Sequence, residues 1–357
     1  MKVAVYTIAL NEEHFVERWY ESAKDADYLL IADTGSTDNT LLTAAKYGIE
    51  VASIFVRPWR FDNARNAALA LLPEDIDYCI ALDMDEILLP GWRQELEKAF
   101  ESGSTRPRYK YTWSWKDLEE TIPGLQYGGD KIHSRWNYRW KHPVHEVIVP
   151  DRIEEKQSWC NLEIHHHPDA SKSRSQYLPL LELAVKEDPW DDRNAYYYAR
   201  ELFFAQQYAK AFKEFKKYLA LPTARWNAER SAALRYMAKC LGDKDREKYL
   251  LLAKNEAPER REPLVDLALF YFDKNDWKNC LKYSKAATKI SDKPLEYLCE
   301  EFAWGSIPYD LVAVSSYYLG YYKQAILFGE KAIKAEPTNN RLIENYKLYE
   351  QAFKDKK

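Results

Sequence analysis

The first hundred or so residues alternate short apolar runs with segments whose apolar positions recur every three or four residues. The runs are rich in β-branched and aromatic side chains and predict strands over residues 2–9, 28–32 and 49–56, with a fourth that ends at Asp83. The segments between them predict helices, the first with Asn11 as its N-cap. Strands and helices that alternate in such short units are typical of a parallel sheet with right-handed crossovers.

The middle of the chain has a different pattern. Over residues 106–164, aromatic and polar residues alternate with a period of two, as at Tyr109, Tyr111 and Trp113, which predicts half-exposed strands. We expect the glycine-containing residues 123–129 to form a loop between two of them. Six of the seven histidines fall between His133 and His167.

After Ser175 the apolar positions follow a helical period to the end of the chain. Prolines punctuate this part at intervals of 33, 36, 36 and 43 residues. Helix pairs that repeat about every 34 residues are typical of tetratricopeptide-like repeats, and we expect roughly three to four copies. Their aromatic residues are first of all inter-helix core, and a surface that binds an extended segment is the second interpretation. The sequence thus predicts an α/β domain over residues 1–170 and an all-α domain over 175–357.

The composition of the chain limits the classes of partner and the cellular location that we expect. The formal net charge is −4, from 52 basic and 56 acidic residues, so no global charge favours nucleic acid or an acidic membrane surface. The five cysteines are scattered, as expected for reduced thiols in a cytoplasmic protein. No apolar run approaches the roughly 20 residues of a membrane span. A strand at residue 2 leaves no room for a signal peptide, so we expect a cytoplasmic protein.

Polar clusters follow three of the predicted strands, over residues 7–12, 33–38 and 83–86. In a parallel sheet the carboxyl ends of the strands meet at one edge, and ligands bind beyond that edge. The sequence contains neither a glycine-rich dinucleotide fingerprint nor a P-loop that could hold a pyrophosphate. A cation bound by the aspartates could neutralise a phosphorylated ligand instead.

Asp83 and Asp85 are the best candidates to bind that cation. They lie two residues apart, so their carboxylates share a side if the chain stays extended across Met84. Two hard oxygen ligands suit Mg²⁺ or Mn²⁺. For an isolated pair of this kind, a solvated strand end whose aspartates cap a later helix is the more common interpretation, and it is the upstream clusters that favour the metal site.

Four segments together carry a family resemblance: TIALNE at residues 7–12, ADTGSTDNT at 32–40, ARN at 64–66 and LDMDE at 82–86. In this order they resemble the family 2 glycosyltransferases of the GT-A fold. The resemblance implies a Rossmann-like mixed sheet with helices on both faces. It also implies inverting transfer of a sugar from a nucleotide-sugar donor, such as a UDP- or GDP-sugar, to an acceptor.

The same resemblance implies roles for individual residues. Asp33 would bond the nucleotide base, Arg65 would contact the nucleotide, Asp83 would face the ribose, and Asp85 would bind Mn²⁺ or Mg²⁺. The nucleotide pocket would be lined by the segment that contains Thr7, Ala9, Asn11 and Glu12.

Downstream candidates are Glu146, two histidines and two cations. The segment HPVHE at residues 142–146 resembles a further element of the family, and Glu146 is the candidate general base. Alternatively, Glu146 pairs with an arginine such as Arg135 or Arg139. If His166 points away, His165 and His167 share a face, and one of them could complete the metal shell. The last two candidates could hold the departing diphosphate or belong to a solvated linker: Lys172 and Arg174.

Two other functions stay open from the sequence. A degenerate α/β domain could serve as a non-catalytic scaffold whose repeats recruit a protein partner or a second copy. A nucleotidyltransferase would share carboxylate-bound metals, but residues 7–12 lack the glycine and lysine of its phosphate loop. The acceptor could be a glycan, a peptide or a lipid.

Overall fold

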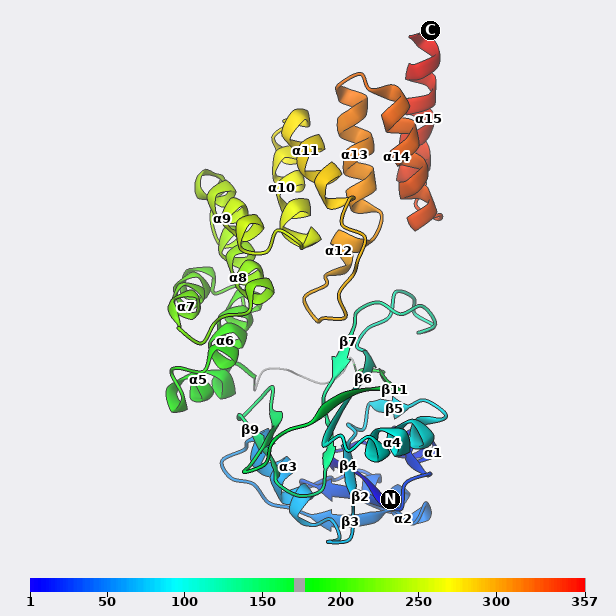
Figure 1. Cartoon of the computed structure of the whole chain (residues 1–357), viewed down its shortest axis with the longest axis vertical. Helices are drawn as coiled ribbons and strands as arrows, with labels where there is room; N and C mark the ends of the chain where they lie inside the picture. The colour runs from blue at the N-terminus through cyan, green and yellow to red at the C-terminus, as the bar shows by residue number, and fades with distance from the viewer. Residues whose placement is uncertain (170–176, 357) are drawn as a thin grey trace. The chain divides into compact units, whose positions relative to one another are not determined.

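A computed structural model of the chain describes residues 1–169 and 177–356 (Figure 1). By its internal contacts the chain divides into two compact units, Met1–Glu187 and Asp188–Lys357. The α/β unit comes first and the helical unit second, as predicted. The helix α5 (Tyr177–Glu187) belongs to the first unit, where Glu187 forms an ion pair with Arg60 at 2.5 Å.

The other elements of the first unit are, in chain order, β1 (Val3–Ala9), α1 (Val16–Ala23), β2 (Tyr28–Asp33), α2 (Thr40–Lys46), β3 (Glu50–Ser53), α3 (Phe61–Ala70), β4 (Tyr78–Ala81), β5 (Glu86–Leu88), α4 (Trp92–Glu101), β6 (Arg106–Thr112), β7 (Gln126–Gly129), β8 (Ile132–Ser134), β9 (Tyr138–Lys141), β10 (Val147–Pro150) and β11 (Gln157–His166).

The central sheet has five strands in the order β3-β2-β1-β4-β8. The first four are parallel, and only β8 runs antiparallel, against β4. This confirms the predicted parallel sheet. Strand β4 is buried along its whole length, which is why it reads as a continuous apolar run. A second sheet follows the order β5-β11-β6-β7, and β9 and β10 form a separate antiparallel pair.

Buried aromatic side chains fix the carboxyl ends of the central strands. The Trp19 indole of α1 donates to the carbonyl of Leu82 at 3.0 Å, just before the acidic segment. On the other face, the Trp140 indole donates to the Tyr6 hydroxyl at 2.7 Å, and that hydroxyl lies 3.2 Å from Nε2 of His133. Packed aromatic rings therefore support the edge of the sheet that follows Leu82.

Two local predictions are wrong. Asn11 does not cap a helix, because α1 begins at Val16 and Asn11 adopts a φ of 55°. The predicted loop over residues 123–129 ends earlier, because Gln126–Gly129 forms β7 and pairs with β6. The Asp117 carboxylate accepts the backbone N–H groups of Thr121 and Ile122, which closes the loop before that strand.

The regular elements that the structure describes in the second unit are all helices. Its elements are α6 (Asp192–Phe204), α7 (Tyr208–Ala220), α8 (Asn227–Lys239), α9 (Asp243–Glu256), α10 (Arg261–Asp273), α11 (Trp277–Ala287), α12 (Glu301–Trp304), α13 (Ile307–Tyr318), α14 (Tyr322–Ala335) and α15 (Asn340–Asp355).

Four helix pairs stack along the second unit: α6 with α7, α8 with α9, α10 with α11, and α13 with α14 (Figure 1). The helical-repeat prediction and its copy number are confirmed. The first helices of the pairs begin at residues 192, 227, 261 and 307, so the first two steps are 35 and 34 residues and the third is 46. None of the helices described has both the length and the apolar composition that a bilayer crossing requires.

The buried imidazole of His133 should make the first unit sensitive to acid. Burial lowers the pKa of His133 to about 4, so the unfolded chain, with an ordinary pKa of about 6.5, binds a proton that the folded chain excludes. Stability should therefore fall between about pH 6.5 and pH 4, by about 3 kcal/mol. We expect His133→Gln to flatten this part of the pH profile of urea unfolding.

The control is His14→Gln, because the side chain of His14 is 88% exposed. It should keep the wild-type profile. An equal loss of stability with pH in the wild type and in His133→Gln would show that another group causes the acid sensitivity.

Candidate functional site

The loops after β1 and β2 are tied to each other at the edge of the sheet. The buried Asp33 carboxylate accepts the backbone N–H groups of Gly35 at 3.0 Å and Ser36 at 3.1 Å. Gly35 has a φ of 117°, which this turn needs and which other residues rarely adopt. The Asn11 amide oxygen accepts the N–H of Thr37 at 2.7 Å. Asp33 and Asn11 thus hold the loop beyond the strands, and their roles toward a nucleotide stay predictions.

The other predicted pocket residues of β1 and its loop are largely enclosed. Thr7 and Ala9 are buried within β1, and the carbonyl of Ala9 accepts the N–H of Thr34 at 2.9 Å. Glu12 is buried as well, and its backbone N–H donates to the Thr40 hydroxyl at 2.7 Å. These residues hold the end of β1 against the start of α2.

The acidic segment forms a tight turn. Strand β4 ends at Ala81, and the N–H of Glu86 donates to the carbonyl of Asp83 at 2.9 Å. The backbone is therefore not extended across Met84, whose side chain is buried in the core, so the condition for the two carboxylates to share a side is not met. As a result the two aspartates face different partners.

Asp83 lies in a cluster of charges. Its carboxylate accepts from Arg65 at 2.6 Å and from the Lys131 ammonium at 2.5 Å. Arg65 also bridges to Glu146 at 2.5 Å, and its guanidinium lies over the Trp140 ring at 4.9 Å. Burial by itself would raise the pKa of Asp83, but the positive charges of Arg65 and Lys131 outweigh burial and hold that pKa below its usual range. Asp83 is thus a fixed, ionised acceptor.

Glu86 forms hydrogen bonds to two members of this cluster, Asp83 and Lys131. It is 1% exposed and accepts the N–H of Asp83 at 2.9 Å, Lys131 at 2.8 Å and the Tyr111 hydroxyl at 2.6 Å. The Glu86 carboxylate therefore orients both the turn and the ammonium group. These hydrogen bonds explain how the third acidic residue of the segment can be buried.

Asp85 faces a histidine, but not one of those predicted. Nε2 of His166 lies 3.3 Å from the Asp85 carboxylate, and the His166 ring stacks on Trp113 at 4.4 Å. Burial lowers the pKa of His166, but the bond and the charge of Asp85 outweigh burial and raise that pKa above its usual value. His166 therefore does not point away from Asp85, so the condition under which His165 or His167 would complete the metal shell is not met.

The two predicted histidines have other partners. His165 lies 3.0 Å from Glu163, and His167 pairs with Glu120. The backbone N–H of His167 does donate to the carbonyl of Asp85, at 2.8 Å. Register explains the difference, because β11 runs antiparallel to β5 with His166 opposite Glu86. Within the described ranges no three histidine, cysteine or acidic side chains converge on one metal position.

Glu146 pairs with an arginine, as the alternative interpretation held, but the partner is Arg65. Arg135 instead donates to the carbonyl of Leu72 at 2.8 Å, and Arg139 is exposed. Asn66, next to Arg65, exchanges two hydrogen bonds with the backbone of Trp140, which fixes α3 to β9. Lys172 and Arg174 lie outside the described residues.

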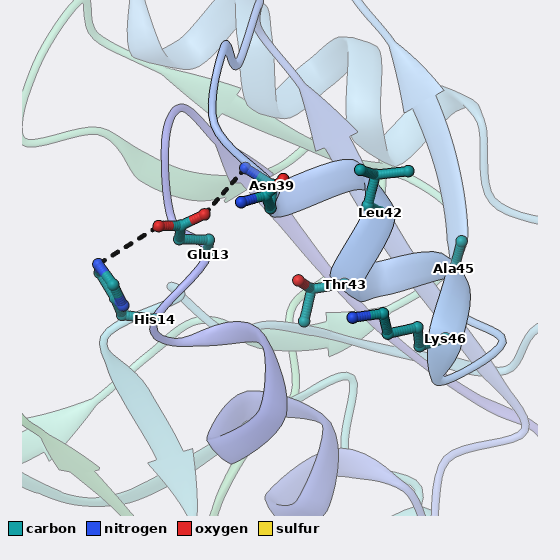
Figure 2. A pocket seen from close by; sticks show the side chains of 7 residues that line it. All are labelled: Glu13, His14, Asn39, Leu42, Thr43, Ala45 and Lys46. Atoms are coloured by element: carbon teal, nitrogen blue, oxygen red, sulfur yellow. Dashed lines mark hydrogen bonds and ion pairs between the residues drawn. The ribbon is translucent and has the colours of Figure 1, made fainter.

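A surface depression of about 750 Å³ lies on α2 (Figure 2). One side is formed by Glu13 and His14, and Glu13 accepts the N–H of Asn39 at 2.9 Å. Leu42, Thr43, Ala45 and Lys46 line the rest. None of the predicted site residues lines it, so the candidate site is the charged turn and not this depression.

Residues 4–143 match the family model described as Glycosyl transferase family 2. These residues form a family 2 glycosyltransferase domain. The resemblance carried by the four sequence motifs is thereby confirmed. An uncharacterized glycosyltransferase of Rickettsia bellii (strain RML369-C) is 29% identical over 102 residues, which are 28% of this chain and 33% of that protein. The match thus spans about a third of that relative's length.

Two solved structures are similar to portions of this chain. Glucosyl-3-phosphoglycerate synthase from Mycobacterium tuberculosis, in complex with Mg²⁺ and uridine diphosphate, is 27% identical over 31% of this chain and 43% of that one, with a TM-score of 0.27. A thermophilic TPR protein of Thermus thermophilus is 19% identical over 48% of this chain and 88% of that one, with a TM-score of 0.33.

Sequence reasoning missed Lys131 in the glycosyltransferase domain. Lys131 precedes β8, and its carbonyl accepts the N–H of Ala81 at 3.1 Å, two residues before Asp83. No local pattern marks this lysine, because it reaches the site only through the antiparallel pairing of β4 with β8. A pairing between strands so distant in the chain is not visible in either segment alone.

Removal of the Arg65 guanidinium should destabilise the glycosyltransferase domain strongly. Arg65→Ala would leave Asp83 and Glu146 without their shared counter-charge in a mostly enclosed site, and a broken buried pair costs about 3–5 kcal/mol. We expect a loss of at least about 3 kcal/mol in urea unfolding. The control, Arg152→Ala, removes a side chain that is 90% exposed and should leave stability unchanged. Equal stability of the two variants would contradict the bridging role of Arg65.

Proposed function

We propose that the protein transfers a sugar from a nucleotide-sugar donor to an acceptor hydroxyl. The observation that carries the proposal is the charged turn of residues 83–86, which lies at the carboxyl end of β4 inside the part of the chain that matches the glycosyltransferase family. In a sheet of this topology, ligands bind at that edge.

In this proposal the two aspartates bind different parts of the donor. Asp83 is ionised and held by Arg65 and Lys131, so its carboxylate can accept hydrogen bonds from ribose hydroxyl groups. The ammonium of Lys131 adds positive charge where a nucleoside diphosphate would lie. Arg65 keeps the Asp83 carboxylate in place and prevents its protonation.

Asp85 and His166 are the proposed protein ligands of a divalent cation. One carboxylate and one imidazole fit Mn²⁺ or Mg²⁺ if water and substrate phosphates supply the remaining ligands. A bound cation would offset the negative charge that builds on the diphosphate as it leaves. This assignment replaces His165 and His167, whose side chains pair with Glu163 and Glu120.

Glu146 is the proposed general base. An acceptor oxygen would bond to the anomeric carbon as the bond from that carbon to the diphosphate breaks, with inversion in one displacement. The acceptor proton would pass to Glu146, whose carboxylate is fixed by Arg65 beside the proposed ribose-binding aspartate. In the described structure that carboxylate is engaged with Arg65, so proton transfer would require this ion pair to loosen.

Loss of the Asp85 carboxylate should abolish transfer while the fold remains intact. We expect Asp85→Ala to reduce metal-dependent release of nucleoside diphosphate from UDP- or GDP-sugars by about 100-fold or more, because it removes stabilisation of the leaving group. The far-ultraviolet spectrum should not change. Asp151→Ala, at a half-exposed carboxylate outside the cluster, is the matched control. Full activity of Asp85→Ala would refute the proposal.

A donor should also stabilise the protein. A nucleotide sugar at 100 times its Kd, with Mn²⁺ or Mg²⁺ present, adds about 2.7 kcal/mol to the free energy of unfolding. We expect the matching donor to raise Tm in a thermal-shift screen, and Asp83→Asn to reduce that rise. No shift with any donor would favour a degenerate domain that serves as a scaffold.

A further inference from the structure

The irregular repeat of the helical unit contains a segment that the regular repeats lack. The step from α10 to α13 is 46 residues, against 35 and 34 for the others. The extra residues lie in the non-helical stretch between α11 and α12, over residues 288–300, and in the short helix α12. Within that stretch, residues 296–300 make specific contacts, and we call them the inserted segment.

Tyr297 is the aromatic anchor of the inserted segment. Its hydroxyl donates to the Glu229 carboxylate of α8 at 2.5 Å. Its ring stacks on Tyr197 of α6 at 6.2 Å, with an interplanar angle of 19°, and contacts the edge of Trp226 at 5.7 Å. The tyrosine therefore touches the first helices of two successive pairs.

Two glutamates of the inserted segment form ion pairs with arginines of α8 and of the N-cap of α10. Glu300 accepts from Arg235 of α8 at 2.6 Å, and Arg235 is only 3% exposed. Glu296 accepts from Arg260, the N-cap of α10, at 2.7 Å. Arg260 also donates to the Cys299 sulfur at 3.4 Å. The inserted segment thus contacts α6 and α8 through its tyrosine, and α8 and the start of α10 through its two carboxylates.

The surface formed by α6, α8 and α10 offers more donors than the inserted segment uses. Nη2 of Arg235 and Nε of Arg200 are buried and have no hydrogen-bond partner among the described residues. The Arg200 guanidinium stacks on Tyr197 at 4.4 Å, next to the Tyr297 ring. A buried donor without an acceptor costs free energy, so this surface keeps donors that favour a ligand with carboxylates.

We propose that the α6–α8–α10 surface recognises an extended peptide that carries a tyrosine flanked by carboxylates, and that the chain's own Glu296–Glu300 occupies this surface as an intramolecular ligand. The partner would present carboxylates one residue before and three residues after its tyrosine, as the inserted segment does. This inference does not depend on the proposed sugar transfer, because every contact lies within the helical unit.

The test supplies the inserted segment in trans. A fluorescent peptide of residues 291–301, with Cys299→Ser to prevent oxidation, is titrated into the full-length chain and followed by fluorescence anisotropy. The tethered copy should exclude the peptide from the wild type, because its effective concentration is high. In the double variant Tyr297→Ala/Glu300→Ala the surface is vacated, and the peptide should bind at least about tenfold more tightly.

Two further samples keep the test decisive. Tyr297→Phe removes only the hydroxyl that Glu229 accepts, so it should bind the peptide with intermediate affinity even if the double variant fails to fold. Asp292→Ala alters an exposed residue near the inserted segment and should behave as the wild type does. A peptide that itself carries Tyr297→Ala should lose binding by about tenfold or more. The proposal would be overturned if the peptide bound the wild type and Tyr297→Phe with equal affinity. It would also be overturned if the peptide that carries Tyr297→Ala bound as tightly as the unchanged peptide.

Discussion

The candidate site depends on one bridging interaction, in which the Arg65 guanidinium holds Asp83 with one edge and Glu146 with another. The two carboxylates come from segments far apart in the chain, and a buried arginine is the group that can satisfy both without its own deprotonation. The ring of Trp140 lies against the guanidinium and limits its movement. Because of this bridge, the residue proposed to face the donor and the proposed base occupy fixed positions relative to each other.

The turn at residues 83–86 separates the functions of its carboxylates. Met84 is buried and Trp19 donates to the carbonyl of Leu82, so the chain turns where an extended strand would have continued. The Asp83 carboxylate then contacts Arg65 and Lys131, the Asp85 carboxylate contacts His166, and Glu86 is buried. A turn of this kind lets three adjacent carboxyl groups remain close without sharing one environment, which reduces their mutual repulsion.

In the helical unit, too, the packing of neighbouring elements determines the partner of each side chain. Regular helix pairs bury their aromatic residues against each other, as in the stack of Tyr271 on Tyr283. The pair with extra residues places Tyr297 against Tyr197 of α6 and pairs Glu300 with Arg235 of α8. The interpretation of these aromatic residues as inter-helix core is therefore confirmed, and a surface that binds an extended segment stays a proposal.

The sequence by itself determined the order of the units, the parallel alternation, the repeat period, the family resemblance, and the candidacy of Asp83, Asp85 and Arg65. These features depend on local periodicity and on motifs a few residues long, which one strand or helix records completely. Only the tertiary structure decided that Lys131 joins Asp83, that His166 and not its neighbours meets Asp85, and that Tyr297 covers α6 and α8. Strand register and chain reversal bring those residues together, and a shift of one residue would turn each side chain to the opposite face.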